Sequence, residues 1–373
     1  MAKSAYIHIP FCAHKCDFCD FAAFAGVDEL SLEYCQVVAG EIRDRLAKQP
    51  NAEKLASLFY GGGTPGYIDP AHLEVVHAAL VTRVGLQDDA EVTIETTPQS
   101  ITVDKAKAWK KMGINRISVG VQSFHDGELK AMGRDHTAQQ ALTGIGNALE
   151  AGFSNVALDL MYGLPEQTLQ SWRQTLKTAL GLSLPHMSAY GLTIAVNSPL
   201  LQRYPRESES YPNEDGFVDM YKELVDSCAD VGLQQYEVSN FSKPGFESTH
   251  NLAYWQNQEY LAFGVSAHRY VESVRSSNFR SLKRYMREPL GDETHEIIDE
   301  KTRAKEAIFL GLRMRRGLNL AEFRDRYGCD LESILAEKIQ RLSDGGFVTL
   351  EDGWLRLSQS GVLVSNLVLA ELV

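Results

Sequence analysis

Three cysteines near the start of the chain have the types and spacing of a chemical site. Cys12, Cys16 and Cys19 form a C-x3-C-x2-C pattern. Thiolates are ligands for iron–sulfur clusters and for zinc. A structural zinc site needs four ligands, and His14, the obvious fourth, lies between two of the cysteines, where its ring would more naturally point away. Three cysteines on a four-iron cluster leave one iron open, which is a catalytic arrangement. Chance clustering of core cysteines is the alternative, and the spacing argues against it.

The cysteine pattern follows directly after the first predicted strand, residues 6–9. It therefore lies on a loop at the C-terminal end of that strand, the end that carries the active site in α/β sheets and barrels. Cys35, Cys228 and Cys329 are scattered along the chain, and we expect them to fill space as small hydrophobic residues.

A repeated alternation of strand and helix must position this loop. Strands are predicted at 6–9, 55–60, 91–95, 116–121, 156–161 and 186–191. Helices are predicted at 30–47, 71–83, 104–112, 137–151, 168–180 and 214–231. This alternation indicates a parallel sheet with right-handed crossovers. Six units are too few for a complete eight-fold barrel, so the pattern leaves two alternatives, an open partial barrel and a doubly wound sheet.

The rhythm breaks after the sixth helix and divides the chain into three regions. Residues 1–234 form the α/β region, and residues 235–299, rich in aromatics, Asn, Ser and Gly, are interpreted as a connecting segment that packs against it. Residues 300–373 are predicted to hold three helices and a short hairpin, at 304–315, 320–327, 331–344 and 354–357. Three helices followed by a hairpin indicate a winged-helix-like module.

Composition excludes several classes of protein. The chain has 373 residues, 44% of them hydrophobic and 23% charged, which excludes a disordered, collagen-like or disulfide-scaffold protein. Its formal charge of −12 makes nucleic acid and anionic lipid poor partners. A small basic cluster, Arg313, Arg315 and Arg316, is interpreted as a solvated helix face near a hinge. With no apolar run long enough for a membrane span and no signal peptide, we expect a cytoplasmic protein.

Several short motifs beyond the cysteines point to one family. They are YIHIPF at 6–11, CDF at 19–21, YGGGTP at 60–65, GVQS at 120–123, GRDH at 133–136 and DLMYGLP at 159–165. With these motifs the chain resembles the radical S-adenosylmethionine superfamily, and within it the family related to oxygen-independent coproporphyrinogen III oxidase. The similarity extends over nearly the whole chain. HNLAYW at 250–255 matches an HNxxYW motif that is typical of the haem chaperone branch of that family.

The resemblance implies an α/β fold, a partial (β/α)6 barrel followed by a smaller C-terminal helical, winged-helix-like domain. It implies a [4Fe–4S] cluster on Cys12, Cys16 and Cys19, whose open iron is chelated by the amino and carboxylate groups of S-adenosylmethionine. It also implies a set of residues that contact S-adenosylmethionine or, in the case of the last, haem: Tyr6, Phe18, Gly62, Gly63, Thr64, Glu95, Gln122, Arg134, Asp159 and His250.

The residue types suit these roles. Gly61–Gly63 lacks Cβ atoms, which lets backbone groups approach the methionyl part of the cofactor, although a tight turn also uses glycine. Glu95 can accept hydrogen bonds from ribose hydroxyls, and Arg134 offers a fork of donors for a carboxylate. Gln122 and Asp159 lie at or near strand ends, where they could face the same cavity.

Two functions compete within the family. The first is a haem chaperone that binds haem and transfers it to an unidentified acceptor protein; the second is an oxidase-like radical enzyme. The oxidase branch carries a fourth cysteine two residues after the third, where this chain has Phe21. HNxxYW favours the chaperone, because His250 could supply an axial imidazole while Tyr254 and Trp255 stack on a porphyrin. Without the resemblance, His250 would be interpreted as a hydrogen-bonded histidine that packs the segment against the barrel.

A third interpretation is a redox-sensing module whose cluster regulates the C-terminal region, and the acidic charge argues against DNA as its ligand. The expected partners are therefore haem and an acceptor protein, without nucleic acid or an integral membrane segment. A homodimer is one assembly that the sequence leaves open. The sequence also leaves open whether S-adenosylmethionine is cleaved in function, and so whether the protein is an enzyme.

Overall fold

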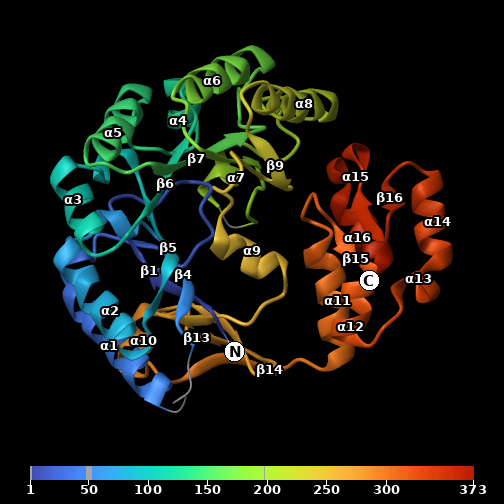
Figure 1. The fold of residues 1–373 in the computed structure, drawn as a ribbon. Coiled ribbons are helices and arrows are strands. Elements are labelled where there is room, and N and C mark those ends of the chain that lie inside the picture. Colours follow the sequence, from blue (N-terminus) through green and yellow to red (C-terminus); the bar gives the residue numbers. More distant parts are fainter. Residues whose placement is uncertain (1, 48–52, 197) are drawn as a thin grey trace.

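The computed structural model describes residues 2–47, 53–196 and 198–373, and in these ranges the largest sheet has nine strands (Figure 1). In spatial order the strands are β11 (Leu261–Phe263), β1 (Ser4–Ile9), β4 (Leu55–Gly62), β5 (Leu86–Thr96), β6 (Arg116–Gln122), β7 (Asn155–Tyr162), β8 (His186–Gly191), β10 (Asn240–Ser242) and β9 (Gln234–Glu237). The strands of the six predicted units, β1 and β4 to β8, are neighbours in chain order, and each pairs in parallel with the next. A doubly wound sheet would reverse its order at a switch point, so the sheet is a partial barrel.

Helices cover the outer face of this curved sheet (Figure 1). Those of the six units are α1 (Ser31–Ala47), α2 (Pro70–Arg83), α3 (Val103–Lys111), α5 (Ala138–Glu150), α6 (Leu169–Gly181) and α8 (Glu214–Asp230). Local sequence fixes where they begin: Thr137 and Thr168 cap α5 and α6 in capping boxes completed by Gln140 and Ser171. Two short helices, α4 (Asp126–Ala131) and α7 (Pro199–Arg203), were not predicted.

The strands alternate between an apolar outer face and an inner face that carries polar groups. In β1 the side chains of Ala5, Ile7 and Ile9 are fully buried in the main core, while Tyr6 and His8 lie on the other face, because successive strand residues point to opposite sides. The barrel therefore places its functional groups inside the curve and its hydrophobic core between sheet and helices.

The segment 235–299 is more than a connection. β9, β10 and β11 extend the barrel sheet at its two edges, and α9 (Thr249–Trp255) lies on the concave side of the sheet (Figure 1). A second, antiparallel sheet follows, made of β12 (His268–Val271), β13 (Val274–Asn278) and β14 (Asp292–Ile297), with α10 (Leu282–Arg287) between its last two strands. β9 to β13 have only three to five residues, too few for a clear periodicity, and the six residues of β14 are all exposed, so they give no alternation of buried and exposed side chains.

The C-terminal region forms the helical module that the sequence predicted, with a hairpin after the helices. Its elements are α11 (Glu300–Gly311), β15 (Leu318–Asn319), α12 (Leu320–Tyr327), α13 (Leu331–Ile334), α14 (Ala336–Asp344), β16 (Val348–Glu351), β17 (Trp354–Leu357), α15 (Gln359–Leu363) and α16 (Ser365–Leu372). The strands pair in the order β15-β17-β16, and the last two helices were not predicted. None of the helices within the described ranges is long and apolar enough to cross a bilayer.

Candidate functional site

The cysteine loop is anchored across the carboxyl ends of β1 and β4. Cys12 lies in β2 (Phe11–Cys12), which pairs in parallel with β3 (Phe24–Ala25), so the loop between them returns to its starting point. The backbone N–H of Thr64, just after β4, donates to the carbonyl of Phe11 at 2.8 Å. The loop thus lies at the edge of the barrel that the sequence assigned to the site.

The three thiols differ in exposure and in partners. Cys12 is buried, and its Sγ lies 3.5 Å from the hydroxyl of Thr64, whereas Cys16 and Cys19 are partly exposed. Arg134 donates from Nη1 to Cys16 Sγ at 3.1 Å and from Nη2 to the carbonyl of Gly120 at 2.6 Å. One arginine therefore joins the cysteine loop to the end of β6.

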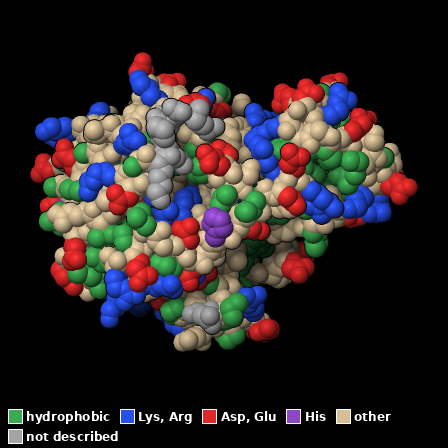
Figure 2. Space-filling view, turned by 90° about the horizontal axis from the view of Figure 1, so that it is seen from below, with side chains coloured by type: hydrophobic (Ala, Val, Ile, Leu, Met, Phe, Trp, Pro, Cys, Tyr) green, Lys and Arg blue, Asp and Glu red, His purple; other side chains and the backbone are tan. Residues whose placement is uncertain are grey.

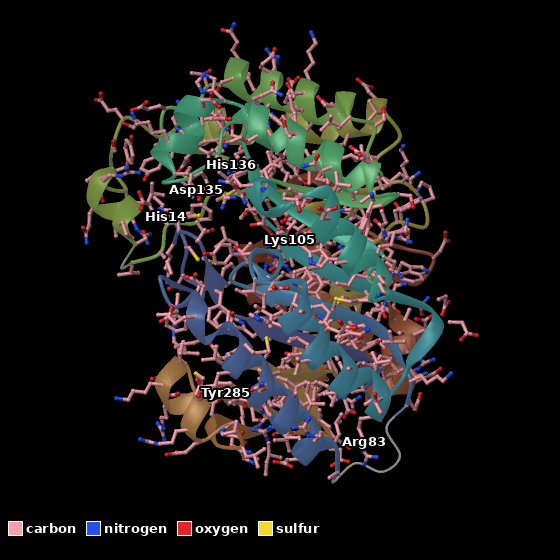
Figure 3. The ribbon with its side chains drawn as sticks, turned by 90° about the vertical axis from the view of Figure 1, so that its left-hand side faces the viewer. His14, Arg83, Lys105, Asp135, His136 and Tyr285 are labelled. Atoms are coloured by element: carbon pink, nitrogen blue, oxygen red, sulfur yellow. The ribbon has the colours of Figure 1, made fainter. Side chains whose placement is uncertain are left out.

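The segment that follows β6 and α4 contacts the cysteine loop, because the backbone N–H of Asp17 donates to the carbonyl of Met132 at 3.2 Å. Figure 3 labels His14 of the cysteine loop and, from the segment after α4, Asp135 and His136, all on the same side of the view. His14 is exposed. In the part of the chain that the structure describes, no three His, Cys, Asp or Glu side chains are arranged to hold one metal ion.

The chemistry of the donors fits an iron–sulfur cluster. Burial raises the pKa of the Cys12 thiol to about 11 and also raises the pKa of Cys19. A buried thiol keeps its proton unless a cationic centre replaces that proton, and iron in a cluster is such a centre. Cys12, Cys16 and Cys19 are the residues that would hold a [4Fe–4S] cluster, with Arg134 as a cationic neighbour.

The glycine run at the end of β4 is required by close contacts within the protein. A Cβ on Gly62, whose φ is +111°, would lie 2.5 Å from the ring of His8, and one on Gly63 would lie 2.7 Å from the carbonyl carbon of Pro10. A Cβ on Gly61 would lie 2.9 Å from both Glu95 Oε2 and the Tyr6 ring. Protein neighbours therefore exclude side chains at all three positions, and the backbone amide of Gly62 is free to donate to Glu95 Oε2 at 3.1 Å.

Two predicted acids face the interior from strands on either side of β6. Burial raises the pKa of Glu95 to about 8, and the nearby charge of Asp159 contributes in the same direction. Burial also raises the pKa of Asp159, whose two oxygens accept from Ser118 Oγ at 3.2 and 3.1 Å. Acids in this situation are suited to accept hydrogen bonds from ligand hydroxyls or to bind a cationic group.

Gln122 occupies a strained backbone position at the end of β6. Its φ is 69°, in the left-handed region, and the pairing of β6 with β7 shifts register between Gly120 and Gln122. Such bulges re-aim side chains and are frequent beside active sites. A Cβ on Gly120 would lie 3.2 Å from Gln122 Nε2 and 3.7 Å from Arg134 Nη2, so the structure brings Gln122, Arg134 and Cys16 together.

The predicted aromatic contacts have protein partners. The Tyr6 hydroxyl bonds His8 Nδ1 at 3.1 Å, and its ring stacks on Phe59 with centroids 6.2 Å apart. Phe18 packs on a small hydrophobic cluster that includes Met132 and Met161. Tyr6 therefore lies beside Glu95 at the glycine run, while Phe18 secures the cysteine loop.

His250 does not lie open to a ligand in this structure. It is 1% exposed, with Nδ1 3.0 Å from Ser57 Oγ and Nε2 2.9 Å from the Tyr254 hydroxyl. Its ring stacks on Phe59 at 5.0 Å, and burial, aided by the charge of Arg116, lowers its pKa to about 3. The histidine is thus neutral, and both of its nitrogens are hydrogen-bonded.

Sequence reasoning missed the residues that hold α9 in place. Glu91 of β5 accepts from the backbone N–H groups of Thr249 and His250 and from Ser248 Oγ, all at 3.2 to 3.3 Å. Arg116, 2% exposed, has its Nε 3.8 Å from Glu91. Charged residues at inward positions of otherwise apolar strands were the available signal, because a buried charge needs a partner.

Comparisons with known proteins agree with this arrangement. Residues 6–179 match the radical SAM superfamily, and residues 298–364 match the HemN C-terminal domain. The chain is 34% identical to the heme chaperone HemW of Bacillus subtilis, covering 98% of this chain and 97% of the relative. It is 31% identical to HemW of Escherichia coli, with coverage of 98% and 97%.

A mitochondrial protein is also related to the chain. The bovine radical S-adenosyl methionine domain-containing protein 1 is 30% identical, over 99% of this chain and 86% of the relative. Among solved structures, coproporphyrinogen III oxidase (HemN) from Escherichia coli, a radical SAM enzyme, superimposes with a TM-score of 0.86, covering 99% of this chain and 89% of that chain at 22% identity. That likeness establishes the shared fold, and the full-length relatives establish the branch. The chain belongs to the HemW family of radical SAM proteins.

Proposed function

We propose that the protein is a haem chaperone, which binds haem and passes it to an acceptor protein. The observation that carries the proposal is the full-length relation to the HemW proteins, which are named heme chaperones. The geometry supports it, because the cysteine loop and the inward strand-end residues form one site while the HNxxYW helix α9 lies beside it on the concave face of the barrel.

Specific residues would serve the radical SAM core. Cys12, Cys16 and Cys19 would hold the [4Fe–4S] cluster, whose open iron would bind the amino and carboxylate groups of S-adenosylmethionine. Glu95, on the inner face of β5, is suited to accept from the ribose hydroxyls, and Arg134 donates charge-assisted hydrogen bonds beside Cys16. Gly62, Gly63, Thr64, Gln122 and Asp159 complete the proposed cofactor-contacting set, with Tyr6 and Phe18 as aromatic supports.

Haem ligation by His250 stays a prediction, and the hydrogen bonds of its ring define what ligation would require. Because Ser57 and Tyr254 occupy both ring nitrogens, iron could bind only after at least one of these hydrogen bonds breaks. The exposed His268 of β12 is the next candidate ligand in the same segment.

Haem titration tests the proposed function directly. The anaerobically purified protein should bind haem with a Soret band distinct from that of free haem, and should release it to apomyoglobin used as a generic acceptor. Absence of any specific haem binding by the wild-type protein would reject the proposal.

An oxidase-like enzyme is the competing function. Phe21, which replaces the oxidase branch's fourth cysteine, is 67% exposed and offers no ligand. The discriminating assay incubates the reduced protein with S-adenosylmethionine and coproporphyrinogen III. We expect no decarboxylated product, and its formation would favour the enzyme.

A cytoplasmic location is part of the proposal and is supported by six free cysteines, which stay reduced there.

A further inference from the structure

The end of β6 makes a tight turn at Gln122. The backbone N–H of Ser123 donates to the carbonyl of Val121 at 2.9 Å, and the φ of Gln122, which lies between them, is 69°. A hydrogen bond that closes three residues around a positive φ forms the rare, strained kind of γ-turn. Such strain persists only where the surrounding contacts enforce it. The contacts that enforce this turn therefore decide where the Gln122 side chain lies.

Two residues of the GRDH motif bond the carbonyls at this turn. Arg134 Nη2 donates to the carbonyl of Gly120 at 2.6 Å, and His136 Nε2 lies 3.1 Å from the carbonyl oxygen of Val121. The Val121 oxygen is the one that closes the γ-turn. The GVQS and GRDH motifs, which are separate in sequence, thus form one unit in which His136 bonds the turn itself.

The His136 ring has one nitrogen engaged and one without a partner. Its side chain is 4% exposed, and burial, aided by the charge of Arg134, lowers its pKa to about 4, so the ring is neutral near pH 7. Because a carbonyl oxygen can only accept, Nε2 carries the single ring proton and donates it to Val121. Nδ1 is left as an acceptor, and it is buried without a hydrogen-bond partner among the described residues.

Packing alone does not account for a histidine at this position. A buried acceptor without a partner costs free energy, and an apolar side chain of similar size would avoid that cost. The Val121 carbonyl would still accept from the Ser123 N–H without the imidazole. The contribution of His136 is therefore a second hydrogen bond to the turn, which fixes the Val121 carbonyl in place.

A buried acid holds the other end of the turn. Figure 2 shows Asp and Glu side chains spread over the molecular surface, mixed with Lys and Arg. Glu128 of α4 departs from this distribution, because it is 3% exposed. It accepts from Ser123 Oγ at 2.6 Å, and from Ser171 Oγ and Gln167 Nε2 at 2.5 and 3.1 Å. The residues on both sides of Gln122 are thus fixed by buried side chains.

The Gln122 amide is the group that this arrangement presents. Its side chain is half-buried, and within the described chain no hydrogen bond holds the amide. We propose that His136 is a positioning residue, which holds the Gln122 amide ready for S-adenosylmethionine by donating to the Val121 carbonyl. A group that is already in place loses less freedom when the ligand binds. The inference rests on the proposed S-adenosylmethionine site and adds to it a residue that acts through Gln122.

The test compares two replacements of His136 in the cluster-loaded protein. The amide nitrogen of glutamine is as many bonds from Cα as Nε2 is, so His136→Gln can still donate to Val121, whereas His136→Leu cannot. Equilibrium dialysis measures the affinity for S-adenosylmethionine. We expect His136→Leu to bind about three- to ten-fold more weakly, the effect of one hydrogen bond, and His136→Gln to bind like the wild type.

The matched control is His77→Leu. His77 of α2 is also removed from full exposure, and its Nδ1 lies 2.9 Å from the Tyr60 hydroxyl, away from the turn. This variant should bind S-adenosylmethionine like the wild type, and all variants should keep the iron and sulfide content of the wild type. An equal loss of affinity in His136→Leu and His136→Gln, or no loss in either, would overturn the inference.

A double variant tests whether His136 acts through Gln122. Residues that act as one unit give non-additive effects, so His136→Leu combined with Gln122→Ala should bind S-adenosylmethionine like Gln122→Ala alone. Additive losses would overturn the inference and leave Gln122 in the cofactor site. Wild-type affinity in Gln122→Ala would remove Gln122 from the proposed site and the inference with it. Failure of the haem-binding function is recognised separately, from the wild-type haem titration.

Discussion

The cysteine loop and the HNxxYW helix carry the two most specific motifs of the chain. The two differ in how far their spacing in the sequence predicts their arrangement in the structure. The loop closes on itself through β3, and its other partners are Thr64 and Arg134, which are 52 and 118 residues away in sequence from the cysteines that they contact. Helix α9 is held by Ser57 and Glu91, which lie 193 and 159 residues away in sequence from His250. Distant residues therefore hold both motifs in place. The three thiols, however, lie within eight residues on one closed loop, so their convergence can be predicted from spacing, whereas the surroundings of His250 cannot.

The difference also concerns which way the motif residues face. The cysteine pattern lies on one loop at the edge of the barrel, as the spacing predicts. In α9 the motif divides, because adjacent helix positions are about 100° apart, so Tyr254 faces the barrel while Trp255 faces the C-terminal module. The sequence expectation that Tyr254 and Trp255 share one porphyrin face did not account for this division.

The largest expected effect is loss of the cluster when a cysteine of the loop is replaced. Cys12→Ala should abolish the visible absorption of the [4Fe–4S] cluster, because a three-cysteine site has no spare ligand. Cys16→Ala and Cys19→Ala should do the same, while Cys329→Ala should leave the spectrum unchanged. Full iron and sulfide content in Cys12→Ala would show that the ligands have been wrongly assigned.

The next prediction concerns haem ligation on the α9 side. If His250 ligates haem iron, His250→Ala should lose or shift the Soret band and lower haem affinity at least ten-fold, while the cluster spectrum stays intact. Ser57→Ala should have the opposite sign, since it removes a hydrogen bond that competes for the ring. An unchanged haem spectrum in His250→Ala would leave the histidine with a purely structural role and direct attention to His268.

Much of the fold was predictable because its signals are local. Strand and helix alternation gave the six units, and caps such as Thr137 and Thr168 set the helix starts. The sequence did not predict β10 and β11, because three-residue strands are defined by their neighbours in the sheet. The Glu91–Arg116 pair was not predicted for a similar reason, since β5 and β6 meet only in the folded barrel.

A third prediction tests whether long-range contacts hold α9. Glu91→Gln should lower the free energy of unfolding by about 2–4 kcal/mol, because a buried carboxylate that accepts three hydrogen bonds loses its charge beside Arg116. The control is Glu53→Gln, whose partially exposed pair with Lys3 should contribute about 0–1 kcal/mol. Chemical denaturation measures both. Equal stability of the two variants would contradict the assignment of Glu91 as the anchor of α9.

The smallest expected effect is pH-dependent and lies at Glu95, between the two regions. Its pKa in the folded protein is raised from 4.5 to about 8, so folding favours the protonated form. The stability that this carboxyl contributes is therefore fully present below pH 4.5 and is lost as the pH rises towards 8. One pKa unit corresponds to about 1.4 kcal/mol, so we expect Glu95→Gln to gain up to about 1.4 kcal/mol for each pH unit over the cofactor-free wild type within this range.

Binding of S-adenosylmethionine should reverse the order of stability, so that the wild type becomes more stable than Glu95→Gln. A carboxylate that accepts from ribose hydroxyls gives a charge-assisted hydrogen bond of about 1.5–3 kcal/mol, so Glu95→Gln should bind S-adenosylmethionine roughly ten-fold more weakly. Denaturation at several pH values and a cofactor titration measure the two signs independently. Parallel pH profiles for wild type and variant would exclude the raised pKa, and equal cofactor affinities would place the ribose elsewhere. If both signs are observed, Glu95 keeps a costly buried carboxylate because the ligand, unlike the protein alone, stabilises its charge.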